Sequence, residues 1–173
     1  MNKEKIKFDK FGLFLSILFG FITAFIITGA DHFYYQYKVE ELAGSNSQFS
    51  LLTLMAGVFY GGVFEELLMR LFIMSLLIWL MMKIFRKTKD TLSNGYYWMA
   101  IIIAAILFAV GHFPATEMLF GELTATLIVR SLILNGIGGI FFGYLYWKKG
   151  LEYGIIAHMF AHIFMQLVFN LIF

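Results

Sequence analysis

Six ionisable side chains interrupt otherwise apolar stretches of this sequence, and their types are those that perform acid–base chemistry. They are Glu65, Glu66, Arg70, His112, His158 and His162. A charged group inside a membrane span is costly, so it serves either a structural pairing or a function. Carboxylates and imidazoles together can activate a water molecule and stabilise the negative charge of a hydrolytic intermediate.

The two adjacent glutamates are expected to have different roles. Successive residues of a helix point about 100° apart, so the two carboxylates face different directions. Glu66 and Arg70 are four residues apart with the acid first, which is the favourable order for an ion pair. We therefore expect Glu66 to pair with Arg70 and Glu65 to face a cavity as a general base. The alternative is that both carboxylates serve interhelical pairing, with Arg130 as a further partner.

The histidines lie in later apolar segments. His158 and His162 are four residues apart and share one face of the last segment. Two imidazoles at this spacing can hold a metal ion or donate hydrogen bonds to an oxyanion, although a single helical histidine more often satisfies a local polar contact. His112 follows Gly111 at the end of another segment, and a glycine there allows a backbone or a substrate to come close.

The composition indicates that membrane-spanning helices position these side chains. The chain has 173 residues, of which 61% are hydrophobic and 14% are charged, against roughly 45–50% and about 25% in soluble domains. It contains no cysteine, which excludes a cysteine protease, a thiolate metal site and a thiol redox motif. The basic residues are not interleaved with exposed aromatic residues, so no nucleic-acid partner is expected.

We predict an all-α, polytopic transmembrane helical bundle that forms a single membrane domain over residues 1–173. About five spans are expected, at roughly 11–30, 51–82, 97–120, 123–147 and 151–173. Residues 11–50 would form an N-terminal anchor span with an outer loop, and 51–173 the core that carries the motifs. One segment is expected to be split or re-entrant. Gly61-Gly62 is a candidate break in the second, and the third is expected to end near His112 and Pro114, with 113–122 as a re-entrant or surface loop.

The charge distribution predicts the orientation. Ten basic residues fall on one side of the expected spans: Lys3, Lys5, Lys7, Lys10, Lys83, Arg86, Lys87, Lys89, Lys148 and Lys149. Lys38 is alone on the other side, among five acidic residues. By the positive-inside rule we expect the N-terminus to be cytoplasmic and the C-terminus to be outside. We expect the membrane to be a bacterial plasma membrane. In the fourth segment, Gly139 and Gly143 form a small-residue face for close helix packing.

The chain resembles the CPBP family, the CAAX-protease and bacteriocin-processing membrane proteins, also called the abortive-infection family. Three motifs carry the resemblance: Glu-Glu-x-x-x-Arg at 65–70, Phe-x-x-x-His at 108–112 and His-x-x-x-His at 158–162. Their order and separation match the family over about residues 51–170. One position departs, because His162 stands where the family has asparagine or aspartate.

The resemblance implies an intramembrane endopeptidase acting on a small or membrane-associated peptide or protein substrate. Glu65, helped by His112, would activate the attacking water, His158 and His162 would stabilise the oxyanion, and Glu66 and Arg70 would brace the site. Zn²⁺ held by Glu65, His112 and His158 is one option, and a metal-free mechanism on the same residues is equally open.

Two further hypotheses remain from the sequence. The first is a non-catalytic bacteriocin-immunity or partner-regulating membrane protein on the same scaffold. The second is a proton- or ion-coupled carrier, since Glu/His clusters also build relays, although no internal repeat supports it. The identity of the substrate, its dependence on a prenyl group, the membrane face to which the site opens and the oligomeric state stay open, as does the role of Arg130.

Overall fold

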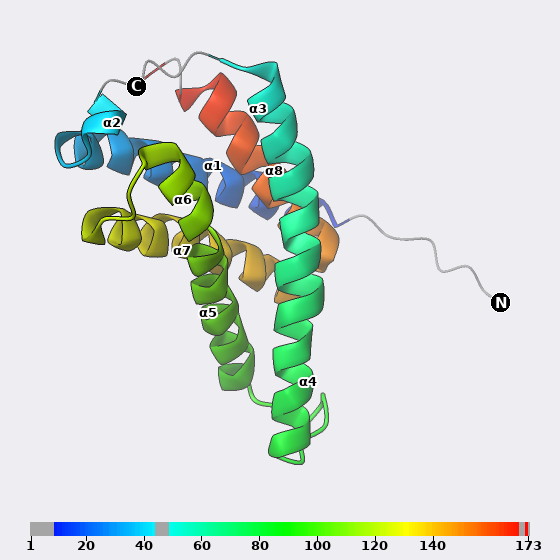
Figure 1. Ribbon diagram of the computed structural model, residues 1–173. Coiled ribbons are helices and arrows are strands. Elements are labelled where there is room, and N and C mark those ends of the chain that lie inside the picture. Colours follow the sequence, from blue (N-terminus) through cyan, green and yellow to red (C-terminus); the bar gives the residue numbers. More distant parts are fainter. Residues whose placement is uncertain (1–8, 44–48, 170–171, 173) are drawn as a thin grey trace.

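The computed structural model describes residues 9–43, 49–169 and 172, and this part of the chain is helical with no β-strand (Figure 1). The predicted helical bundle is therefore confirmed. Its elements are α1 (Lys10–Phe33), η1 (Tyr35–Tyr37), α2 (Glu40–Ala43), α3 (Leu51–Ala56), η2 (Gly57–Glu65), η3 (Leu67–Met74), α4 (Ser75–Ile84), α5 (Asn94–Gly111), α6 (Phe113–Phe120), α7 (Ala125–Lys148) and α8 (Leu151–Leu167). Lys3, Lys5 and Lys7, most of the 43–50 loop and the end of the last predicted span lie outside the described residues.

Four helical segments of the described chain are long and apolar enough to cross a bilayer. They cover Lys10–Tyr37, Leu51–Ile84, Asn94–Phe120 and Ala125–Lys148. The fifth predicted span corresponds to α8, whose 17 residues are at the lower limit of about 17–25 for a spanning helix. The chain is thus an integral membrane protein. Three of the long helices begin at side chains that cap a backbone N–H, namely Asp9, Ser50 and Thr124.

The segment Leu51–Ile84 is one continuous helix of 34 residues, so Gly61-Gly62 does not divide it. Its middle is π-helical over η2 and η3, with Glu66 between the two stretches. Such widened turns are rare and frequently occur at functional sites. The glycine pair has a different role, because it allows α8 to pack closely: a Cβ atom at Gly62 would overlap the Met159 side chain.

The split falls on the third predicted span. Helix α5 ends at Gly111, His112 forms the junction, and the short helix α6 follows with Pro114 in its first turn, a position that proline tolerates. The segment 113–122, expected to form a re-entrant or surface loop, is helical over Phe113–Phe120. A Cβ atom at Gly111 would meet nothing within 4 Å, so no other part of the described chain packs closely against this glycine, and the approach of a substrate there stays a prediction.

Small residues bring the remaining helices together. The predicted face of α7 is confirmed, since a Cβ atom at Gly139 would lie 2.8 Å from the Ala105 Cβ of α5, and one at Gly143 would lie 3.1 Å from Ile101 Cγ2. Helices α1 and α8 also lie side by side (Figure 1). At Gly20 of α1, a Cβ atom would lie 2.6 Å from the backbone oxygen of Ala157.

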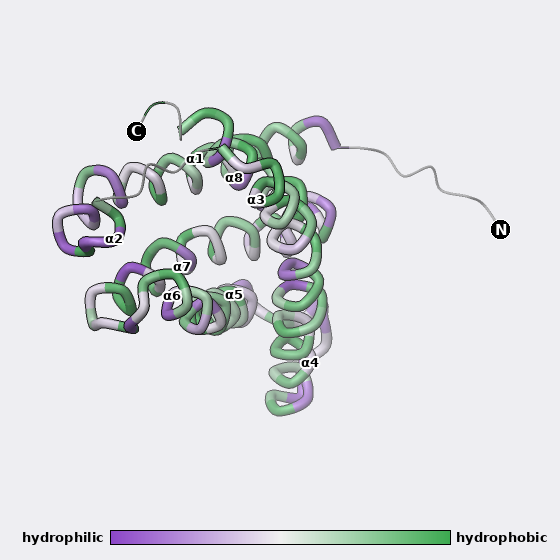
Figure 2. The backbone as a smooth tube through the Cα atoms, turned by 45° about the horizontal axis from the view of Figure 1, so that its top comes forward, coloured by the Kyte–Doolittle hydropathy of each residue, from purple (hydrophilic) through white to green (hydrophobic). Residues whose placement is uncertain are grey.

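Polar contacts fasten the bundle at both ends. Where α1 begins, α7 ends and α8 begins, Lys149 Nζ lies 2.6 Å from Asp9 Oδ2, and the Asp9 backbone N–H donates to the Tyr153 hydroxyl. The hydrogen bond from Lys149 is the main reason why the pKa of Asp9 is lowered. At the other end, Arg130 of α7 binds Asp31 of α1 through two nitrogens, at 2.7 and 2.5 Å. Hydrophilic residues gather near α2 and at the end of α4 (Figure 2).

Candidate active site

Glu66 lies in a sealed ion pair. Glu66 and Arg70 are fully buried, and Arg70 Nε lies 3.1 Å from Glu66 Oε2, so the pairing predicted from their spacing is confirmed. The other carboxylate oxygen, Oε1, accepts a hydrogen bond of 3.0 Å from His158 Nδ1. The Arg70 guanidinium also lies over the Phe108 ring at 5.4 Å and the Phe142 ring at 6.0 Å, contacts that favour a buried cation.

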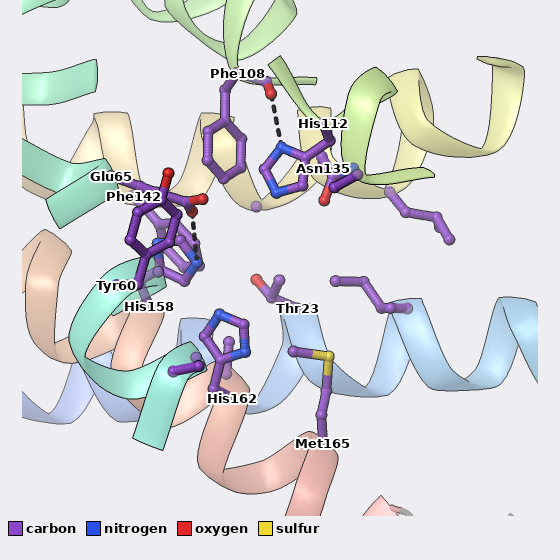
Figure 3. Close-up of a pocket in the computed structure, with 18 of the residues that line it drawn as sticks. Thr23, Tyr60, Glu65, Phe108, His112, Asn135, Phe142, His158, His162 and Met165 are labelled. Atoms are coloured by element: carbon purple, nitrogen blue, oxygen red, sulfur yellow. Dashed lines mark hydrogen bonds and ion pairs between the residues drawn. The ribbon is translucent and has the colours of Figure 1, made fainter. Parts of the chain in front are cut away.

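Glu65 faces a cavity of about 460 Å³, as the sequence predicted. Its side chain is 20% exposed, and its Oε2 lies 3.9 Å from His158 Nε2. His158 therefore lies between the two adjacent glutamates, with one ring nitrogen toward each. Figure 3 shows the side that faces Glu65. Because a carboxylate only accepts, Nδ1 of His158 carries the proton that binds Glu66, and in the neutral ring Nε2 has the free lone pair toward Glu65.

His112 lines the same cavity from the junction of α5 and α6. Its Nδ1 lies 2.8 Å from the carbonyl oxygen of Phe108. Since that oxygen can only accept, Nδ1 donates and the neutral ring keeps its lone pair on Nε2. The helix ends at this residue, and the bond to the last turn fixes both the tautomer and the ring. His112 can therefore take or return a proton at Nε2.

His162 lies one turn beyond His158 on α8 and lines the cavity too. The two imidazole rings stack with their centroids 5.1 Å apart and their planes inclined by 16°. Two glycines of η2 form the seat of the His162 ring: a Cβ atom at Gly57 would lie 2.5 Å from Nδ1, and one at Gly61 would lie 2.5 Å from Nε2. A methyl group at either position would require the ring to shift, so the two glycines leave room for an imidazole where the family pattern has a smaller side chain.

The structure also places a polar residue that the sequence did not single out. Asn135 of α7 lines the cavity beside His112 (Figure 3). Its Nδ2 donates to Ser131 Oγ at 3.1 Å, and Ser131 Oγ donates to the Ala109 carbonyl oxygen at 3.0 Å. This relay fixes the carboxamide and leaves its oxygen as an acceptor. The signal in the sequence was an asparagine in the interior of an apolar span, just before a glycine-rich stretch.

Arg130 does not contribute to this cavity. Its bidentate pair with Asp31 and the Phe120 ring 5.7 Å from its guanidinium carbon place it at the junction of α1, α6 and α7. The alternative in which Arg130 pairs with Glu66 is therefore wrong, because Glu66 is taken by Arg70 and His158.

The donor set does not form a metal site. Among the described residues, no group of three or more His, Asp and Glu side chains is arranged so that it could hold a metal ion. Glu65 and His158 approach each other, but His112 does not complete a three-ligand set with them as proposed from the sequence. The residues as they stand therefore do not fit Zn²⁺, and we derive no step through a metal.

Comparison with known families decides the classification. A family model described as type II CAAX prenyl endopeptidase, Rce1-like, matches residues 46–164, which is well over half of the chain. The chain belongs to this family. This match is consistent with the resemblance of the chain to the CPBP family. All three motifs that carry this resemblance lie inside the matched region. A search of curated proteins found no match, and neither did a search of solved structures.

Proposed function

We propose that the chain is an intramembrane endopeptidase that hydrolyses a peptide bond inside the cavity. The observation that carries this proposal is the convergence of four titratable side chains on one cavity. Glu65, His112, His158 and His162 come from three segments far apart in the sequence and all line it. The match to an endopeptidase family supports hydrolysis over transport.

In the proposed reaction, Glu65 takes a proton from a water molecule and the resulting hydroxide attacks the carbonyl carbon of the scissile bond. The Nε2 atom of His112, the basic nitrogen of that ring, assists in holding the water. A ring N–H of His162 donates to the oxyanion. The proton on Glu65 then passes to the leaving amine as the carbon–nitrogen bond breaks.

The group of Glu66, Arg70 and His158 supports the site next to Glu65. Glu66 accepts from His158 and so orients that ring toward Glu65, in the way that a buried carboxylate orients a catalytic imidazole. His158 lies beside Glu65. When its ring is protonated, it would stabilise the Glu65 carboxylate and the negative charge of the nearby reaction intermediate.

The test uses purified protein in lipid nanodiscs and an internally quenched peptide that ends in a prenylated CAAX sequence, together with the same peptide lacking the prenyl group. We expect Glu65→Gln and His112→Ala each to lower the turnover about 10²- to 10⁴-fold, the range for removal of a general base. Glu152→Gln is the matched control, because Glu152 is an exposed glutamate in the first turn of α8. Full activity of both Glu65→Gln and His112→Ala would end the proposal.

A second function is favoured by one departure from the family pattern, which is His162 in place of asparagine or aspartate. A protein that protects or regulates a partner without cleaving it would use the same scaffold. In that case protection of cells against a bacteriocin would survive Glu65→Gln, whereas an endopeptidase role makes every phenotype depend on Glu65.

A further inference from the structure

The cavity lies toward one end of the bundle. It is lined by the second half of α1, through Thr23 and Ile27, and by the first half of the 51–84 helix, from Thr53 onward. The remaining walls come from the end of α5 with His112, from α6, from the middle of α7 and from α8 between His158 and Met165. Figure 1 shows the end of α8 and the beginning of α3 close together, with α6 also on the upper side of the view. The cavity therefore lies nearer to the end of the molecule where α8 ends and α3 begins.

Most of the basic residues of the described chain lie at the opposite end. Lys10 begins α1, the segment 83–89 contains four lysine and arginine residues where α4 ends, and Lys148 and Lys149 stand where α7 ends. Contacts hold these parts together, since Lys149 pairs with Asp9 and the rings of Tyr97 and Trp147 stack at 4.9 Å.

The cavity end has a different charge. Its acidic residues are Asp31, Glu40, Glu41, Glu117 and Glu122. Its cations in the described chain are Lys38, and Arg130, whose charge is matched by the bidentate bond to Asp31. Positive charge in the short loops of a membrane protein marks the cytoplasmic side, so the charge pattern directs the cavity away from the cytoplasm.

The lining of the cavity indicates what can enter. Apart from Glu65, its polar residues are neutral or are histidines, and no lysine or arginine of the described chain lines it. The rest of the wall is largely apolar, with residues such as Ile27, Leu119 and Met165. A cavity of this kind offers no fixed cation for a carboxylate and favours an uncharged, apolar stretch of peptide.

From these two observations we propose that the cavity opens on the extracytoplasmic face of the membrane. Its substrate is an apolar peptide segment on that side, either exported or on the outward end of a membrane protein. The identity of the substrate rests on the proposed endopeptidase function, but the direction of the opening does not. A cytoplasmic prenylated tail would not reach a site with this orientation.

The direction can be measured directly because the chain has no cysteine. Single cysteines are introduced as Glu122→Cys and Lys87→Cys, a matched pair of exposed charged loop positions at the two ends. Intact bacterial cells expressing each variant are treated with a membrane-impermeant maleimide, before and after permeabilisation. We expect Glu122→Cys to be labelled in intact cells and Lys87→Cys only after permeabilisation. Glu40→Cys, at the start of α2, serves as a second reporter of the cavity end, and any other labelling pattern overturns the proposal.

The substrate class is tested with an unprenylated, quenched apolar peptide and two kinds of membrane vesicle. Right-side-out vesicles should cleave added peptide, and inside-out vesicles should do so only after detergent, with Glu65→Gln inactive in both. Cleavage by intact inside-out vesicles alone would overturn the outward opening and leave the endopeptidase function standing. If no preparation cleaves any peptide even in detergent, the function and the substrate class fail, while the labelling result still decides the orientation.

Discussion

Two neighbouring carboxylates in one helix divide the site into a sealed side and an open side. On the sealed side, Glu66 is fully buried between Arg70 and His158. On the open side, Glu65 is partly exposed to the cavity that His112, His162 and Asn135 also line. The difference shows how two adjacent helical residues acquire two roles. A cation four residues away pairs with one carboxylate, and the rotation of about 100° between successive residues turns the other toward the cavity. Changes on the sealed side should affect stability, and changes on the open side should affect turnover.

The largest effect on stability is expected at Arg70. The variant Arg70→Met leaves the buried Glu66 carboxylate without its cation, and removing one partner of a buried pair costs about 3–5 kcal/mol. Adding Glu66→Gln removes the charge that was left and should recover a large part of that loss. The measurement is thermal unfolding in nanodiscs, followed by size-exclusion chromatography.

Glu65→Gln is the control for this comparison and should unfold at the temperature of the unchanged protein. If Glu65→Gln destabilises the protein as much as Arg70→Met, or if the double variant is less stable than Arg70→Met alone, the division into a sealed and an open side is wrong.

A second prediction concerns the glycine seat of His162. In Gly61→Ala the new Cβ atom would lie 2.5 Å from Nε2 of the ring and would displace it. We expect activity to fall at least about tenfold, because small displacements of catalytic groups have effects of this size. An Ala in place of a helical Gly is otherwise favourable by about 1 kcal/mol, so the loss would come from the displaced ring. Adding His162→Asn should restore activity, because asparagine has no atom at the Nε2 position. The peptide assay in nanodiscs measures both variants.

Gly57→Ala provides the matched control. Its Cβ atom would lie 2.5 Å from Nδ1 and 2.6 Å from Cγ of His162, and asparagine has atoms at both of these positions. His162→Asn should therefore fail to rescue Gly57→Ala. Equal rescue of the two glycine variants, or none, would show that the ring position is not what these glycines determine.

The smallest effect is expected at Asn135. If its carboxamide oxygen accepts a substrate N–H, Asn135→Leu removes one neutral hydrogen bond, which is worth about 0.5–1.5 kcal/mol. We expect KM to rise by a factor of about 3 to 10 with kcat nearly unchanged. Ser131→Ala should have a smaller effect, because it only removes the hydrogen bond that fixes the Asn135 carboxamide. A fall in kcat at constant KM would instead place Asn135 among the groups that act in the transition state.

The sequence predicted the parts of the molecule that depend on pattern and near neighbours. Apolar length identified the helices, the four-residue spacing identified the pairing of Glu66 with Arg70, and Gly139 with Gly143 identified the face of α7 that packs on α5. Three short motifs identified the family. Each of these inferences needs only local geometry or the order of motifs along the chain.

The parts that were missed depend on contacts between distant segments. The role of Gly61-Gly62 depends on α8, which occupies the space that two side chains would need. Arg130 finds Asp31 only because α1 and α7 meet at their ends. Asn135 gains its orientation from Ser131 and from a carbonyl group of α5. The Zn²⁺ option rested on residue types alone, and among the described residues no group of three such side chains is arranged to hold a metal ion.

The glycine seat also couples two positions that lie far apart in the sequence. A Cβ atom at residue 61 would lie 2.5 Å from Nε2 of the His162 ring, whereas asparagine at residue 162 has no atom at that position. A ring at residue 162 and a methyl group at residue 61 therefore compete for the same space, and substitutions at the two positions should be designed together.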